Sequence, residues 1–220
     1  MAWDRRHGQL PYDRRVTVAA VLFDFGGVIS TSPFEAFARH EQSNGLPDDF
    51  LRRVNATDPD VNAWARLERN EIDLGEFDAA FAEESARLGY EVRGRDVLAL
   101  LSGDLRPDMV EAVRRCGERL QTALLTNNIV GMMPGGTLAD VLSLFDEIIE
   151  SSVVGVRKPD PAFYELACER LSIEPADAVF LDDLGINLKP ARAMGMQTIK
   201  VGDPAAAIAE LERIVGFPLG

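Results

Sequence analysis

The sequence predicts an α/β fold: a doubly wound, Rossmann-like parallel sheet with a small α-helical cap domain inserted after the first strand. Two observations lead to this prediction. Short apolar runs alternate with helix-like segments over most of the chain, as in parallel sheets with right-handed crossovers. A long stretch directly after the first run contains only helix-like segments. An insertion at that point is expected to hang over the carboxyl ends of the strands, where a lid belongs.

Five strand-like runs are expected to form the sheet. The first, Val18–Asp24, is apolar, ends in one carboxylate and runs into two glycines, which is typical of a buried strand followed by a sharp turn. The later runs are Thr122–Thr126, Glu147–Glu150, Ala178–Asp182 and Gln197–Val201. Helices are expected around them over Pro107–Leu120, Thr137–Leu144, Pro161–Leu171, Leu188–Met194 and Pro204–Val215. Pro161 and Pro204 suit first helical positions, where the missing N–H costs nothing.

The insertion covers residues 33–104. Apolar residues three and four positions apart predict helices over Phe34–Ser43, Asp48–Val54, Val61–Arg69, Leu74–Leu88 and Arg95–Leu101. We therefore divide the chain into a leader (1–17), an α/β core (18–32 and 105–220) and a helical cap (33–104). The leader is charged and has no apolar signal-peptide core.

Composition and charge exclude several classes of protein. The 220 residues are 46% hydrophobic and 27% charged, as in an ordinary soluble globular protein. No apolar run approaches the roughly 20 residues that span a bilayer. A net charge of −13 argues against nucleic acid or an anionic membrane surface as a partner, and an anionic substrate would need a local cation. Cys116 and Cys168 lie in helix-like segments, which predicts free thiols and a cytoplasmic location.

Asp24 is the first candidate for chemistry. A carboxylate at the C-terminal end of a buried parallel strand lies where open α/β sheets bind their ligands. An Asp that merely caps a turn is an equally good interpretation of this segment in isolation. A second segment, Val179–Gly185, has the same order of apolar strand, acidic end and glycine, and it favours the functional interpretation.

Two further segments are suited to binding an anion. Thr126, Asn127 and Asn128 end a strand with a hydroxyl and two amides, which can hold oxyanion oxygens, although turn-forming Asn explains them as well. Lys158 stands just before the helix expected to begin at Pro161, so its ammonium and the helix N-terminus could face one anion. An ordinary exposed lysine is the alternative.

Asp182 and Asp183 form the fourth candidate segment. Two adjacent carboxylates at a strand end repel each other unless a cation lies between them or one is protonated. Ligands that offer only oxygen indicate a hard ion such as Mg²⁺. Two solvated acids in a loop are the alternative, which the apolar strand before them weakens. The sequence lacks the residues of other hydrolase active sites, because His7 and His40 are the only histidines and no Gly-x-Ser-x-Gly or P-loop pattern occurs.

The order Asp, Thr-Asn, Lys, Asp-Asp at these strand ends resembles the haloacid dehalogenase-like hydrolase superfamily, over nearly the whole chain after residue 17. The segments Ile148–Pro159 and Phe180–Arg192 also look much like the N-terminal phosphatase domain of bifunctional soluble epoxide hydrolases. The resemblance implies a phosphatase whose partner is a small phosphorylated metabolite. It gives Asp24 the role of the nucleophile that forms an aspartyl-phosphate.

The same resemblance implies roles for the other candidates. Thr126, the Asn127 backbone and Lys158 would stabilise charge on the transferring phosphoryl group. The cofactor would be Mg²⁺. Its ligands would be Asp24, the Gly26 backbone carbonyl and Asp183, with Asp182 bound directly or through water. Asn187 would orient the loop that holds the acids.

Gly26 departs from the phosphatase pattern of the superfamily, in which a second Asp two residues after the nucleophile acts as general acid and base. Glycine cannot move a proton, and general acid catalysis is typically worth about 10²–10⁴ in rate. One interpretation is a phosphatase that uses a good leaving group or a proton donor from the cap, with Glu68 and Glu71 as candidates. Ordinary exposed helix acids are the alternative for these two glutamates.

Two other interpretations stay open. A dehalogenase needs no second Asp, because halide leaves without a proton, but such relatives also lack the metal that Asp182 and Asp183 indicate. A weak or inactive homologue would bind a phosphorylated ligand or a partner without turnover. We rank the phosphatase first because the acidic pair is present and some members of the superfamily with glycine at this position are similar to sugar-phosphate phosphatases.

Overall fold

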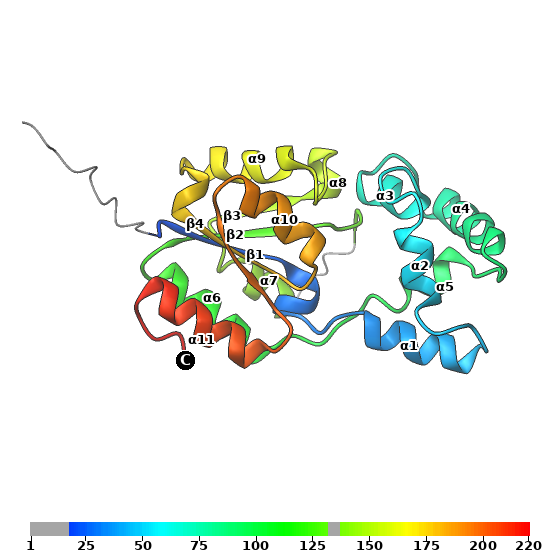
Figure 1. Ribbon diagram of the computed structural model, residues 1–220, viewed down its shortest axis with the longest axis horizontal. Coiled ribbons are helices and arrows are strands. Elements are labelled where there is room, and N and C mark those ends of the chain that lie inside the picture. Colours follow the sequence, from blue (N-terminus) through cyan, green and yellow to red (C-terminus); the bar gives the residue numbers. More distant parts are fainter. Residues whose placement is uncertain (1–17, 132–136) are drawn as a thin grey trace, which may run out of the picture.

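The computed structural model describes residues 18–131 and 137–220, so the predicted leader (1–17) lies outside the described residues. The described chain forms two lobes side by side (Figure 1). One lobe is an α/β core that contains the sheet, and the other contains helices α1 to α5. Among the described helices, none combines the length and the apolar character that crossing a membrane requires.

The core is built on one five-stranded sheet with the strand order β3-β2-β1-β4-β5, in which all neighbouring strands are parallel. The strands are β1 (Ala20–Phe23), β2 (Gln121–Thr126), β3 (Glu147–Glu150), β4 (Ala178–Asp182) and β5 (Gln197–Lys200). All five predicted strands are confirmed. Phe23 lies opposite Leu124 of β2 and Leu181 of β4, so the residues that follow these strands meet at one edge of the sheet.

Helices cover both faces of the sheet, which confirms the doubly wound fold (Figure 1). The core helices are α6 (Pro107–Gly117), α7 (Thr137–Leu142), α8 (Ser151–Val154), α9 (Pro161–Leu171), α10 (Gly185–Ala193) and α11 (Pro204–Val215). Helices α6 and α11 pack on one face, and α9 and α10 pack on the other. The predicted bounds of α9 and α11 are confirmed. Each begins with proline after an aspartate whose side chain caps a backbone N–H.

Helix α10 begins earlier than the sequence pattern predicts. It starts at Gly185 rather than at Leu188. The backbone N–H of Leu184, just before the helix, donates to Asp182 Oδ1 at 2.8 Å, and this bond holds the turn from which the helix starts. The four-residue helix α8 was not predicted, because so short a helix shows no periodicity in the sequence.

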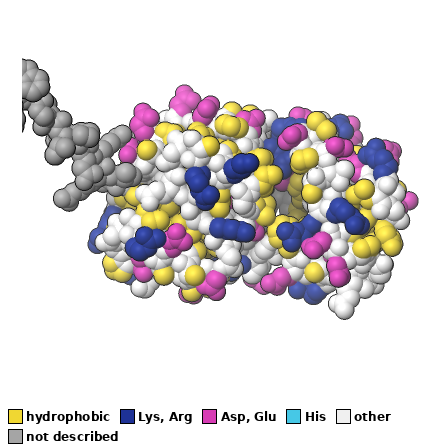
Figure 2. All heavy atoms as spheres, in the orientation of Figure 1, with side chains coloured by type: hydrophobic (Ala, Val, Ile, Leu, Met, Phe, Trp, Pro, Cys, Tyr) yellow, Lys and Arg dark blue, Asp and Glu magenta, His cyan; other side chains and the backbone are white. Residues whose placement is uncertain are grey.

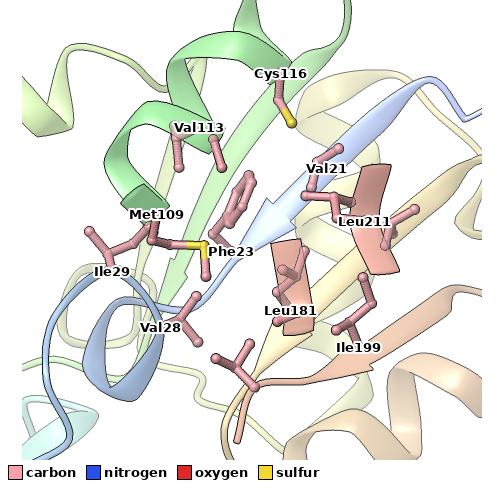
Figure 3. Packing of buried hydrophobic residues seen from close by; sticks show 14 of the residues in the cluster. Val21, Phe23, Val28, Ile29, Met109, Val113, Cys116, Leu181, Ile199 and Leu211 are labelled. Carbon is pink, nitrogen blue, oxygen red and sulfur yellow. The ribbon is translucent and has the colours of Figure 1, made fainter. Parts of the chain in front are cut away.

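The sheet is buried on both faces. Every side chain of β1 is inaccessible to solvent, and alternate side chains point to opposite faces. Val21 and Phe23 pack with Met109 of α6 and Leu211 of α11 (Figure 3), and the other two β1 side chains join the cluster under α9 and α10. Burying a side chain such as Phe or Leu contributes about 1.5–3 kcal/mol. The edge that carries the candidate residues therefore rests on a tightly packed platform.

Both cysteines are buried free thiols, Cys116 in α6 and Cys168 in α9. Burial raises the pKa of the Cys116 thiol to about 12. Burial, with the nearby carboxylates of Glu174 and Glu165, raises the pKa of Cys168 to about 11. Because the thiolate is the nucleophilic form, neither cysteine is a candidate nucleophile.

The second lobe consists of α1 (Phe34–Ser43), α2 (Phe50–Ala56), α3 (Ala63–Glu68), α4 (Leu74–Arg87) and α5 (Gly94–Leu98). These helices enclose a hydrophobic cluster of their own, which includes Phe50, Phe77 and Phe81. Ile129 follows β2 in the core, yet its side chain is buried in this cluster of the second lobe. The helical lobe is therefore packed onto the loop that leaves the carboxyl end of β2.

The two lobes are joined by two chain segments that pair with each other. Ser30 and Leu105 form an isolated antiparallel bridge, and the N–H of Thr31 donates to the carbonyl of Asp104 at 2.8 Å. The chain thus leaves the core and returns to it at one place. We keep residues 33–104 as the proposed cap domain, and we refer to α1 to α5 below as the cap.

Candidate active site

The candidate residues come together at the carboxyl edge of the sheet. Asp24 directly follows β1, Thr126 ends the neighbouring strand β2, and Asp182 ends β4 on the other side of β1. Lys158 belongs to the loop between α8 and α9. Oxygen atoms of Asp24, Asp182 and Asp183 lie within 4.8 Å of one another. Segments separated by more than a hundred residues thus form one site.

Lys158 is the cation of this site, not an exposed lysine. Its Nζ lies 2.7 Å from Asp24 Oδ1 and 2.7 Å from Asp182 Oδ2, and only 1% of the residue is exposed. Burial by itself lowers the pKa of a lysine. Here the carboxylates of Asp182 and Asp24 outweigh burial and raise the pKa of Lys158, so its ammonium stays charged.

Two asparagine side chains hold the loops of the site. Asn127 braces the loop that carries Lys158, because its Nδ2 donates to the carbonyl of Lys158 at 3.0 Å and its Oδ1 accepts from the N–H of Lys158 at 2.9 Å. Asn128 accepts from the hydroxyl of Ser152 in α8 at 2.9 Å. Both side-chain amides are thus engaged within the protein, and the proposed role in holding oxyanion oxygens rests on the backbone of Asn127. The Thr126 hydroxyl has no hydrogen-bond partner among the described residues.

Asp182 is a fully buried anchor. Its Oδ1 accepts from the N–H of Leu184 at 2.8 Å and from Asn187 Nδ2 at 3.1 Å. Its Oδ2 accepts from Lys158 Nζ at 2.7 Å and from Asn187 Nδ2 at 3.0 Å. Tyr164 of α9 donates to the carbonyl of Asn187 at 2.7 Å and holds that asparagine in turn. With both oxygens occupied, this carboxylate has little capacity left for a metal ion.

Asp24 keeps one oxygen free. Its Oδ1 accepts from the N–H of Phe25 at 2.7 Å and from Lys158, whereas Oδ2 accepts no hydrogen bond from a described residue. Burial raises the pKa of Asp24 well above its usual range. The ammonium of Lys158 opposes this shift, and the neighbouring Asp182 and Asp183 add to it. A further cation near the free oxygen would therefore favour the ionised, nucleophilic form.

The donor atoms fit a hard divalent cation. One ammonium, that of Lys158, faces three clustered carboxylates, which leaves excess negative charge in a buried place. Burial, followed by the charge of Asp182, raises the pKa of Asp183 to about 6. The bond that Asp183 Oδ2 accepts from Ser32 Oγ is long, at 3.5 Å. Asp24 and Asp183 thus retain oxygens for a ligand, and sites lined by oxygen suit Mg²⁺.

The two glycines after Asp24 have different surroundings. Gly27 adopts a positive φ of 77°, and a Cβ atom at this position would collide with the carboxylate of Asp183, so the close approach requires glycine. A Cβ at Gly26 would meet no atom within 4 Å. Gly26 is the position where phosphatases of the resembled superfamily carry a second Asp. Crowding at the Cβ position therefore does not explain the glycine.

Three charged residues, Glu68, Glu71 and Arg157, had a weak role or no role in the interpretation of the sequence. Glu68 at the end of α3 is a buried acid, 7% exposed, whereas Glu71 is half-exposed and paired with Arg69 at 2.7 Å. The exposed-acid interpretation therefore holds for Glu71 and is wrong for Glu68. Arg157 contacts Glu68 across the two lobes. Its position directly before Lys158 was the signal in the sequence that could have drawn attention to it.

A family profile for haloacid dehalogenase-like hydrolases matches residues 18–195. The matched region covers most of the chain and includes Asp24, Thr126, Lys158 and the acidic pair that ends β4. The chain belongs to the haloacid dehalogenase-like hydrolase family. It is therefore a hydrolase, as the strand-end motifs predicted.

Curated relatives support the same assignment. The chain is 37% identical over 210 residues to acyl-CoA dehydrogenase family member 10 of Mus musculus (91% of this chain, 19% of that protein). It is 32% identical over 222 residues to bifunctional epoxide hydrolase 2 of Sus scrofa (93% and 40%) and 28% identical over 213 residues to sesquiterpene phosphatase astK of Aspergillus oryzae (91% and 98%). The chain thus spans less than half of the first two relatives. The predicted resemblance to bifunctional epoxide hydrolases is confirmed.

Solved structures share the fold. A family enzyme of Bacteroides thetaiotaomicron, in complex with magnesium and inorganic phosphate, superposes with a TM-score of 0.58 at 19% identity, covering 84% of this chain and 96% of that one. A dehalogenase with an intermediate complex superposes with a TM-score of 0.64 at 18% identity, covering 90% and 97%. At such identities the likeness concerns the fold, and the chemistry has to be argued from the site.

Proposed function

We propose that the protein is a Mg²⁺-dependent phosphatase that hydrolyses a small organic phosphate monoester through an aspartyl-phosphate. The observation that carries the proposal is that Asp24 contacts Lys158 through Oδ1, keeps Oδ2 free of hydrogen bonds from described residues, and clusters with Asp183. The sesquiterpene phosphatase that matches nearly the whole chain supports a phosphate substrate. The net charge of −13 makes such a local cationic centre necessary for an anionic substrate.

In the proposed first step, Asp24 Oδ2 attacks the phosphorus atom, and the bond between phosphorus and the leaving-group oxygen breaks. Lys158, the Thr126 hydroxyl and the Asn127 backbone stabilise the negative charge on the transferring group. In the second step, water attacks the phosphorus of the aspartyl-phosphate, which releases inorganic phosphate and restores the carboxylate of Asp24. Asn127 keeps its loop, and with it Lys158, in place throughout.

Mg²⁺ would be held by Asp24, Asp183 and the backbone carbonyl of Gly26, with Asp182 bound directly or through water. When bound, such an ion supplies Lewis-acid stabilisation of the phosphoryl oxygens. The bonds that Asp182 already makes to Lys158 and Asn187 favour the indirect contact for this residue.

The glycine at position 26 defines the preferred substrate. Without a carboxyl group there, no residue next to the nucleophile protonates the departing oxygen, so we propose a preference for leaving groups that need little protonation. Hydrolysis of aryl phosphates of graded leaving-group pKa measures this preference. A steep dependence of kcat/KM on leaving-group pKa is expected, and a flat one would show that another group supplies the proton.

A dehalogenase is the second candidate function, because Gly26 also suits a halide that leaves without a proton. The clustering of Asp183 with Asp24 favours the metal-dependent reaction instead. A screen of the purified protein against phosphorylated metabolites and 2-haloacids, each with Mg²⁺ and with EDTA, separates the candidates. Phosphate release that EDTA abolishes supports the proposal. Halide release in EDTA contradicts it, and so does binding of phosphate without any turnover.

We also propose a cytoplasmic location and a small phosphorylated metabolite, not nucleic acid or a membrane, as the partner. The two free thiols and the strong negative charge support both proposals. Fractionation of cells that express the full protein would test the location.

A further inference from the structure

Arg157 connects the core to the cap. It precedes Lys158 in the loop before α9, and its Nε lies 2.8 Å from Glu68 Oε2 at the end of α3. Its Nη1 donates to the carbonyl of Pro59, also in the cap, at 3.0 Å. The Nε–H does not point along the line to Oε2, and neither atom has a hydrogen-bond partner among the described residues. The contact between them is thus mainly ionic.

Glu68 is buried, the Arg157 side chain is 19% exposed, and both are held by further contacts. Trp64 Nε1 donates to Glu68 Oε1 at 2.8 Å, and the Trp64 ring packs on Phe77 and Phe81 in the cap cluster. On the core side, the backbone of Lys158 is braced by Asn127, and its ammonium is bound by two carboxylates. The ion pair therefore joins two rigid parts of the molecule, and α3 packs against α8 beside it.

The surface of the molecule is hollowed where the core and the cap meet (Figure 2). Lys158 is 1% exposed, and the residue before it, Arg157, contacts the cap. Burying the Glu68 carboxylate raises its pKa, and the charges of Arg157 and, more weakly, Lys158 oppose that rise. Separating the lobes breaks this ion pair, so the attraction between Glu68 and Arg157 favours the closed arrangement.

We propose that Glu68 and Arg157 form a latch that holds the cap closed on the Lys158 loop, and that both act as positioning residues. The inference rests on the proposed phosphatase function. A latch sets the fraction of molecules in the closed, binding-competent form. Weakening it therefore raises the apparent dissociation constant of the substrate while the chemistry of the closed complex is preserved.

Steady-state kinetics of Glu68→Gln, Arg157→Gln and the double variant, with p-nitrophenyl phosphate and an alkyl phosphate, test the latch. Glutamine keeps the acceptor for Trp64 but removes the charge. Each single variant is expected to raise KM roughly tenfold with kcat changed less than about twofold. The double variant is expected to be no worse than the singles, because it leaves no unpaired buried charge. Glu71→Gln, the same chemical change at a half-exposed acid nearby, is the matched control and should match the wild type.

Two results would overturn the latch. If Glu68→Gln lowers kcat for the alkyl phosphate and not for p-nitrophenyl phosphate, with KM unchanged, then Glu68 is a proton donor. If all variants match the wild type, the pair has no role. Hydrogen exchange measures how often the latch opens and needs no turnover. The backbone amides of α3 should exchange faster in Glu68→Gln than in Glu71→Gln. This measurement is independent of activity, so it separates failure of the latch from failure of the proposed function.

Discussion

The carboxyl edge of the sheet and the cap hold their buried charges in opposite ways. At the sheet edge, Lys158 is bound by two carboxylates, and its backbone is fixed by Asn127. In the cap, the buried acid Glu68 contacts the core through the side chain of Arg157. The core thus supplies charged groups that are fixed in place before a substrate binds, whereas the cap supplies a contact that can open. Changes in the core should therefore affect chemistry, and changes in the cap should affect access.

The largest expected effect concerns the nucleophile. Asp24→Asn is expected to lower kcat by about 10⁴-fold or more, because removing a covalent nucleophile removes the reaction path. Phosphate release and mass spectrometry of the phosphorylated intermediate measure the effect, and circular dichroism checks the fold. Residual turnover near the wild-type rate would show that another residue is the nucleophile.

Substitutions of Asp182 and Asp183 should have different effects, one on stability and the other on metal binding. Asp182→Asn takes one carboxylate from a buried ammonium and is expected to lower the free energy of unfolding by about 3 kcal/mol. Asp183→Asn removes repulsion and is expected to make the metal-free protein at least as stable as the wild type at neutral pH, but without a response to Mg²⁺. Urea denaturation with and without Mg²⁺ measures both. Equal losses of stability would contradict the division of labour between Asp182 and Asp183.

A carboxyl group introduced at position 26 should show whether a missing proton donor in the core limits the reaction. Gly26→Asp adds a side chain whose Cβ meets no atom within 4 Å, and we expect about 10–10² faster hydrolysis of alkyl phosphates with little change for p-nitrophenyl phosphate. Gly26→Asn, which has a similar size but no ionisable group, is the matched control. An equal gain in both variants would show that proton transfer is not the cause.

The smallest expected effect is on pH dependence. The pKa of Asp183 is raised from 3.8 to about 6 in the metal-free folded protein. Between these values the folded state binds more protons than the unfolded state, so the stability of the metal-free protein falls as the pH rises through this window. Protons compete with Mg²⁺ for the same oxygens, so the gain in Tm on adding Mg²⁺ should be larger at about pH 7.5 than at about pH 5. Asp183→Asn should abolish this difference, and a pH-independent gain in the wild type would argue against metal binding at Asp183.

The strands of the core could be predicted from the sequence, whereas the contact between core and cap could not. The strands could be predicted because a strand buried on both faces is a continuous apolar run, and such strands carry Asp24 and Asp182 to one edge. The sequence could not tell Asp182 from Asp183, since the difference lies in partners such as Asn187. The burial of Glu68 depends on Arg157, 89 residues away in the chain, and no local periodicity records a contact between lobes.

The paired connectors at Ser30 and Leu105 have a mechanical consequence. Because the outgoing and returning strands of the cap are bonded to each other, they cannot slide independently. The easiest displacement left to the cap is a swing about that one joint. Such a swing would break the cap contacts of Ile129 and Arg157 in a single movement.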